Sequence, residues 1–177
     1  ALLRGKEQLG TLGSGNHFLE IEVVEELFDE TAATAFGLEP GQICVLIHSG
    51  SRGLGYQVCD DSLARMVKHA GEIGIPLPDR QLACARLTSD WGRDYLAAMA
   101  CAANYAWANR QLLMHLTRET FEKTLGMNPR DLGMRLLYDV CHNIAKIETL
   151  PLAGKNVRLC VHRKGATRAF PPGHPAL

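Results

Sequence analysis

The chain has 177 residues, 46% of them hydrophobic, so it is long enough to bury a sizeable core as one domain or a large piece of one. No run approaches the roughly 18 unbroken apolar residues of a membrane helix, and the first residues have no signal-peptide pattern. Nineteen basic and nineteen acidic residues cancel, which excludes a strong general attraction to nucleic acid. We therefore expect a soluble protein that uses no membrane.

Two strands and a helix are predicted in the first half of the chain. Residues His17 to Val24 alternate in polarity well enough for a strand. Residues Gln42 to His48 form a continuous apolar run, which is typical of a buried strand. A glycine loop follows from Ser49 to Gly55. Apolar residues then recur near helical spacing from Tyr56 to Ile73, which predicts an amphipathic helix that ends at Gly74.

The second half begins with a long alanine-rich helix. Ser89 is a suitable N-cap for it, and its pattern runs towards His115. Thr117 is a candidate cap for a short continuation that stops at Gly126. The mixture of helices and strands has no regular βαβ rhythm, so we predict an α+β fold. Two further strands are predicted, at Arg135 to Val140 and at Val157 to His162.

Three histidines lie at predicted junctions between a strand and a loop. His17 opens its strand, whereas His48 and His142 close theirs. Neutral imidazole is the commonest protein ligand of divalent transition metals, and three rings make a credible site if the fold brings them together. Taken one at a time, each histidine is more often a structural residue.

The loop after the second predicted strand suits an anion. The segment His48 to Gly55 leads into a helix, and its glycines let backbone N–H groups approach phosphate oxygens. Arg52 adds a planar guanidinium that can clamp such oxygens. The alternative is a tight turn with an exposed arginine. We favour the phosphate interpretation, because Arg52 follows a candidate metal ligand by four residues.

A second glycine-rich segment, Gly10 to Asn16, leads into the first predicted strand. Asn16 can contact a base or a ribose, and Glu20 can accept hydrogen bonds from a purine edge. The alternative is an ordinary turn that is followed by a glutamate facing solvent.

Positive charge gathers near the end of the sequence. No acidic residue follows Glu148, whereas the seven residues His162 to Arg168 contain four that can be positive. This suits a negatively charged substrate. Lys164 or Arg168 can stabilise charge that develops on a phosphoryl group. As a feature by itself, such a segment is more often a solvated basic loop.

Several longer segments, taken in order, resemble motifs of the RtcB-type RNA-splicing ligases, and together they cover nearly the whole chain. The resemblance implies the RtcB-like fold, incomplete in this chain. The segments are GTLGSGNHFLE (10–20), VLIHSGSRGLG (45–55), DRQLACA (79–85), NYAWANRQ (104–111), YDVCHNIAK (138–146) and VHRKGATRAFPP (161–172).

This resemblance implies a specific chemistry. The family joins RNA ends that carry a 3′-phosphate or a 2′,3′-cyclic phosphate to 5′-hydroxyl ends, in tRNA splicing and RNA repair. It uses GTP and manganese, two ions per site, and passes through a GMP group attached to a histidine. The matching positions imply roles for seven residues: His17, His48 and His142 as metal ligands, Asn16 and Glu20 as guanylate contacts, and Arg52 and Lys164 as groups that engage substrate phosphates.

Two parts of the family pattern are missing from this sequence. The family's aspartate and cysteine ligands precede its GTLGSGNH motif, and its guanylylated histidine belongs to a later HGAGR motif. His162, in VHRKG, does not fit that motif. The sequence also lacks an initiator methionine, so we expect residues 1–177 to be the central part of a single catalytic domain. Alone, this segment is expected to be inactive.

Two alternatives stay open at this stage: a metal-dependent phosphoesterase that uses the same histidines, and a non-catalytic RNA-binding fragment. The expected partners are RNA, GTP and an archease-type activator. Six cysteines without a CxxC pair indicate reduced thiols and a cytoplasmic protein, nuclear as well if the source is eukaryotic. Two of them, Cys44 and Cys160, lie in apolar runs and are expected to be buried.

Overall fold

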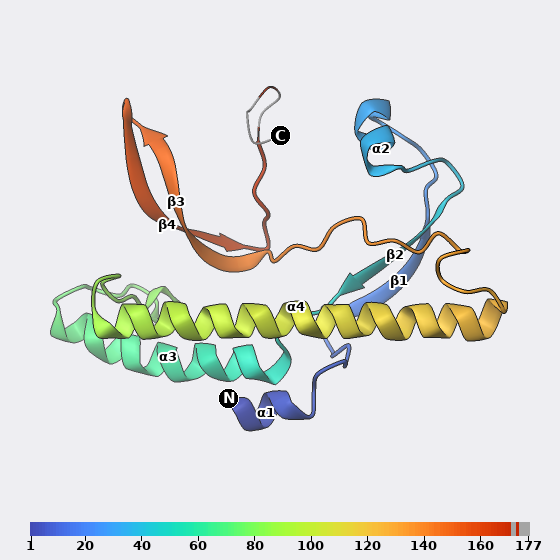
Figure 1. Cartoon of the computed structure of the whole chain (residues 1–177). Coiled ribbons are helices and arrows are strands. Elements are labelled where there is room, and N and C mark those ends of the chain that lie inside the picture. The colour runs from blue at the N-terminus through green and yellow to red at the C-terminus, as the bar shows by residue number, and fades with distance from the viewer. Residues whose placement is uncertain (171–172, 174–177) are drawn as a thin grey trace. The chain divides into compact units, whose positions relative to one another are not determined.

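The computed structural model describes residues 1–170 and 173, and its internal contacts divide the chain into two compact units (Figure 1). The first unit, Ala1–Leu137, holds helices and one two-stranded sheet. The second, Tyr138–Leu177, holds another two-stranded sheet. Both sheets are antiparallel. The predicted α+β class is therefore confirmed, whereas the single catalytic domain stays a prediction.

The first sheet pairs strand β1 (Phe18–Val23) with strand β2 (Ile43–His48), and both were predicted to within one residue. Between them lies a short helix that the sequence analysis did not predict, α2 (Glu30–Phe36), capped by the Asp29 carboxylate. The prediction that β2 is buried was wrong: Ile43 is 56% exposed. A continuous apolar run is buried only where both faces of the strand are covered, and here the sheet has two strands.

Two long helices form the body of the first unit and lie side by side (Figure 1). Helix α3 (Arg52–Glu72) begins four residues before the predicted start and includes most of the expected glycine loop. A 3-10 turn, η1 (Arg80–Leu82), follows it and contacts it. Helix α4 (Asp90–Leu125) has 36 residues, which corresponds to a length of roughly 54 Å.

Both predicted ends of α4 are confirmed. Ser89 caps the start by accepting a hydrogen bond from the Gly92 N–H at 3.1 Å. Gly126 ends the helix in the left-handed conformation, with φ 67°. The predicted break at Thr117 was wrong. The Thr117 hydroxyl donates to the carbonyl of Leu113, one turn earlier, so its hydrogen bond is made within a continuous helix.

A short first helix, α1 (Leu2–Lys6), packs on α3. The Tyr105 hydroxyl of α4 donates to the Gly5 carbonyl at 2.5 Å. A Cβ at position 5 would lie 2.8 Å from a methyl carbon of Leu54, so the small residue permits this close packing. These contacts hold α1 against α3 and α4, a few residues before the glycine-rich segment Gly10–Asn16.

The second unit is a hairpin of β3 (Asn143–Leu152) and β4 (Lys155–Lys164). Ala153 and Gly154 connect the strands and both have positive φ, the conformation of a two-residue hairpin turn. The predicted strand at 157–162 is confirmed as part of β4. The predicted strand at 135–140 was wrong, because these residues have no regular structure and the strand starts at Asn143.

No helix in the described part of the chain is long and apolar enough to cross a membrane. All six cysteines are free thiols, as predicted. The expectation that Cys44 and Cys160 are buried was wrong, since both are partly exposed. Each lies in a two-stranded sheet, where one layer of backbone leaves side chains accessible.

Candidate metal and phosphate site

Two of the predicted histidines meet at one end of the first sheet. His17 directly precedes β1 and His48 is the last residue of β2. The antiparallel register pairs Phe18 with His48, so the two imidazoles come from neighbouring positions on adjacent strands. Their ring centroids are 6.1 Å apart with an edge-on arrangement. The Phe18 ring packs edge-on against His48 at 5.1 Å and orients it.

Arg52 completes this cluster from the start of α3. Its backbone has φ 52°, a left-handed conformation that is uncommon for any residue except glycine. The guanidinium Nε donates to the Thr11 hydroxyl at 3.2 Å, and Nη1 lies 3.1 Å from His17 Nδ1. Because a guanidinium has only donors, His17 Nδ1 is the acceptor. A Cβ at Gly13 would overlap both His17 Nδ1 and the guanidinium, so glycine is required there.

The electrostatic environment of His17 favours its neutral form. Burial lowers the pKa of His17 below its ordinary value, and the positive Arg52 and the neighbouring His48 lower this pKa further. A hydrogen bond to the Leu12 carbonyl opposes these effects but does not reverse them. A neutral imidazole has a lone pair for a cation, whereas a protonated one repels it.

These residues fit part of a metal site. His17 and His48 supply two imidazoles at one place, which suits a divalent transition metal. While His17 Nδ1 accepts from Arg52, the proton of the neutral ring is on Nε2, so neither nitrogen can coordinate. Coordination therefore requires that Arg52 turns away from His17. Within residues 1–170 and 173, no group of three or more His, Cys, Asp or Glu side chains is close enough to hold a metal.

The third predicted ligand, His142, lies in the second unit, immediately before β3. The sequence analysis predicted that His142 closes a strand, and this was wrong, because His142 precedes β3. The His142 carbonyl accepts from the Ala166 N–H at 3.3 Å, and the Asn143 side chain accepts from the Gly165 N–H at 2.8 Å. Asn143 pairs with Lys164 in the register. The hairpin thus brings His142 and Lys164 to the same end.

The predicted guanylate contacts lie beside the histidine pair. Asn16 is exposed and adjoins His17 in the chain. Glu20 is exposed in β1, two residues after Phe18, so its side chain leaves the sheet on the same face as that of Phe18. The positions are compatible with a ligand above this face. The roles of both residues stay predictions.

The predicted anion cradle differs in one respect from the structure. The N–H of Gly53, at the start of α3, donates to the Gln8 side chain at 2.8 Å. This amide is therefore not directed at an anion. Arg52 is the group at the start of α3 that can bind a phosphate by charge.

A network around Asn109 supports the cluster. Asn109, in α4, is completely buried. Its side chain contacts the glycine-rich segment Gly10–Asn16 at Gly10 and Thr11, and the loop after β2 at Ser49 and Gly50. Asn109 lies in the family-like segment NYAWANRQ (104–111), but the sequence alone predicted no role for it. The available signal was the helical spacing of the buried residues Ala102, Ala106, Asn109 and Leu113, in which asparagine is the polar member.

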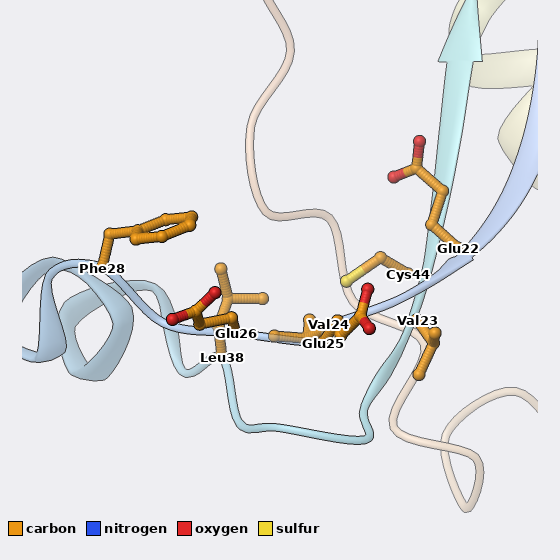
Figure 2. A pocket seen from close by; sticks show the side chains of 8 residues that line it. All are labelled: Glu22, Val23, Val24, Glu25, Glu26, Phe28, Leu38 and Cys44. Carbon is orange, nitrogen blue, oxygen red and sulfur yellow. The ribbon is translucent and has the colours of Figure 1, made fainter.

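A separate hollow lies at the other end of the first sheet (Figure 2). Glu22 pairs with Cys44 in the register, whereas His48 pairs with Phe18, so the length of β1 separates the hollow from the histidines. Its acidic residues disfavour a phosphate ligand. The residues that line it are Glu22, Val23, Val24, Glu25, Glu26, Phe28, Leu38 and Cys44.

Comparisons with known proteins give a consistent result. The family described as tRNA-splicing ligase RtcB matches residues 1–177. Proteins named tRNA-splicing ligase RtcB are 60% identical over 170 residues in Archaeoglobus fulgidus, 57% over 174 residues in Methanocaldococcus jannaschii and 56% over 174 residues in Aeropyrum pernix. These alignments cover 96%, 98% and 98% of this chain, but 35%, 18% and 36% of the respective relatives. The chain therefore spans about a third or less of the relatives' length.

Proposed function

The chain belongs to the RtcB family of tRNA-splicing ligases, and on this premise we propose that the protein containing it is a GTP- and manganese-dependent RNA ligase. The reaction joins a 3′-phosphate or 2′,3′-cyclic phosphate end to a 5′-hydroxyl end, through a histidine–GMP intermediate whose histidine lies outside residues 1–177. The supporting observation is the cluster in which His17 and His48 lie with ring centroids 6.1 Å apart and Arg52 contacts His17.

In this proposal the three histidines bind the metal, and two positively charged side chains bind phosphate. His17, His48 and His142 hold manganese. When bound, the metal supplies positive charge that neutralises phosphate oxygens during nucleotide attack and RNA joining. Imidazole ligands alone do not select manganese over zinc, so the choice of manganese rests on the family.

Arg52 and Lys164 bind the phosphate groups of the substrate. A 3′-phosphate monoester carries negative charge and has no good leaving group, so it must be activated before a 5′-hydroxyl can attack it. Transfer of GMP to the 3′-phosphate supplies a leaving group, and GTP is the source of that GMP. The Arg52 guanidinium contacts His17 and Thr11, and in this proposal it exchanges these neighbours for phosphate oxygens when the substrate binds.

Asn16 and Glu20 are proposed to bind the guanylate. Asn16 adjoins His17, which suits contact with the α-phosphate side of the nucleotide. The Glu20 carboxylate can accept hydrogen bonds from the N–H groups of guanine. The partners in this proposal are RNA and an archease-type activator, and the proposed location is the cytoplasm, with the nucleus as well in a eukaryote.

The test uses the complete product of the gene that contains this sequence. With radiolabelled GTP and manganese, we expect a covalent nucleotide on the protein. With added RNA ends bearing a 3′-phosphate and a 5′-hydroxyl, we expect a joined product. Absence of both the adduct and the joined RNA would contradict the proposal.

The same assay separates the alternatives. A metal-dependent phosphoesterase would remove the terminal phosphate with metal but without GTP. A non-catalytic RNA-binding fragment would bind RNA with a steep salt dependence and take up no metal. The segment 1–177 alone is expected to give no joined product, because the proposed nucleophile lies outside it.

A further inference from the structure

The loops that carry the histidine cluster depend on one buried amide from a helix. Asn109 lies in the middle of α4 and has no solvent exposure. Its Oδ1 accepts from the Gly10 N–H at 2.7 Å. Its Nδ2 lies within hydrogen-bond distance of three acceptors, namely the Thr11 carbonyl (3.1 Å), the Ser49 hydroxyl (3.1 Å) and the Gly50 carbonyl (3.2 Å).

These contacts join two segments that are far apart in sequence. Gly10 and Thr11 precede His17, whereas Ser49 and Gly50 lie between His48 and Arg52. The Ser49 hydroxyl also donates to the Leu12 carbonyl at 2.7 Å, which adds a direct bond between the segments. The next helical residue, Arg110, donates to the Ser49 carbonyl at 3.3 Å.

The same segments carry the side chains of the candidate site. Thr11, whose carbonyl Asn109 contacts, uses its hydroxyl to accept from Arg52. Ser49 directly follows His48. Loss of the Asn109 amide would leave the Gly10 N–H and the Gly50 carbonyl without this partner in a partly buried place, which is costly.

We infer that Asn109 is a positioning residue: its amide holds the two glycine loops together and thereby sets the spacing of His17, His48 and Arg52. This inference deepens the proposed function and rests on it for the identity of the bound metal. The loop geometry itself is independent of that identity. Asn109 touches neither metal nor substrate in this role, because it is buried behind the loops.

The most specific variant is Asn109→Asp. It keeps the shape of the side chain and the acceptor for Gly10, but replaces the amide donor with an oxygen that faces three acceptors. The matched control is Asn104→Asp, which makes the same change at an exposed position of the same helix. Ser49→Ala removes the hydroxyl that accepts from Asn109 and donates to the Leu12 carbonyl, and it adds no buried charge, so it serves if Asn109→Asp does not fold.

The first measurement is amide hydrogen exchange in the complete protein. Two reporter amides are protected by bonds that do not involve Asn109: Thr11 N–H, bonded to the Gln8 carbonyl, and Gly53 N–H, bonded to the Gln8 side chain. We expect Asn109→Asp to speed exchange at both by roughly tenfold or more, with a smaller increase in Ser49→Ala. Exchange within α4 and in Asn104→Asp should stay at the parental rate.

Unchanged exchange at Thr11 and Gly53 would overturn the inference. An equal increase along the whole of α4 would also overturn it, because that result indicates general destabilisation.

The second measurement is the dissociation constant for Mn²⁺. If the parent protein binds Mn²⁺, we expect Asn109→Asp to weaken binding by roughly tenfold, and equal affinity in both would overturn the inference. If the parent protein binds no Mn²⁺ and the loops still loosen in Asn109→Asp, the metal proposal fails and the positioning role stands.

Discussion

Two substitutions of Arg52 separate its contribution to protein stability from its contribution to function. The residue has left-handed backbone geometry, with φ 52°, which costs about 1–2 kcal/mol for a residue with a Cβ. Its guanidinium donates to Thr11 and lies against His17. Arg52→Ala loses both contacts and keeps the backbone strain. Arg52→Gly loses the same contacts but relieves the strain.

The two variants should therefore differ in stability and agree in function. Two partly exposed hydrogen bonds contribute about 0.5–1.5 kcal/mol each, so we expect Arg52→Ala to lower the free energy of unfolding by about 1–3 kcal/mol. Glycine gains unfolded-state entropy that offsets part of the relieved strain, which leaves Arg52→Gly about 1 kcal/mol more stable than Arg52→Ala. In both, loss of a charged hydrogen bond to phosphate should slow RNA joining roughly 10- to 100-fold.

The assays are urea unfolding, followed by single-turnover measurements of protein guanylylation and of RNA joining. Guanylylation should fall less than joining in both variants, because Arg52 is proposed to engage the RNA phosphate. Arg80→Ala, at an exposed arginine of η1, is the control for loss of a surface charge. A joining rate near the parental value in Arg52→Gly would refute the phosphate role. Equal stability of the two variants would refute the strain argument.

We expect His48→Ala to lower manganese content below one-tenth of the parental value, measured by mass spectrometry of the metal, and an unchanged content would remove His48 from the site. We expect Gly13→Ala to displace His17 and Arg52, because the added Cβ overlaps both, and therefore to weaken manganese binding. Gly15→Ala, at another positive-φ glycine with open space around it, is the control for backbone strain and should bind manganese like the parent. The Arg163 hydrogen bonds to Glu148 hold the pKa of Glu148 below its ordinary value. Their stabilisation of the hairpin is therefore present above the unfolded-state pKa of Glu148 and is lost as pH falls through its folded-state pKa. Glu148→Gln should remove this acid-dependent loss in thermal unfolding, and a pH profile identical to that of the parent would contradict the prediction.

The sequence predicted best those features that local patterns determine. The strands next to His17 and His48, the Ser89 cap and the Gly126 end of α4 all follow from alternation and capping chemistry. The junction position of both histidines follows from the same strand limits. The fold places these two imidazoles together, whereas the convergence of all three histidines stays a prediction.

The predictions that were wrong concern features that depend on tertiary context. Thr117 resembles a cap, but its hydroxyl bonds to Leu113 within one helix, and nothing in the local sequence distinguishes these outcomes. The segment 135–140 was predicted to be a strand, yet β-structure needs a partner, and the pairing lies at 143–152 with 155–164. The positive φ of Arg52 could not be predicted either, because it depends on the contacts of its side chain with Thr11 and His17.

The proposed role of His17, His48 and His142 is to bind divalent manganese at one site beside Arg52. Anomalous diffraction at the manganese absorption edge, from crystals of the complete protein soaked in manganese chloride, tests it most directly. We predict a peak within bonding distance of an imidazole nitrogen of each of the three residues, with the Arg52 guanidinium turned away from His17. A manganese peak elsewhere, or a His142 ring that lies outside the coordination shell, would contradict the claim.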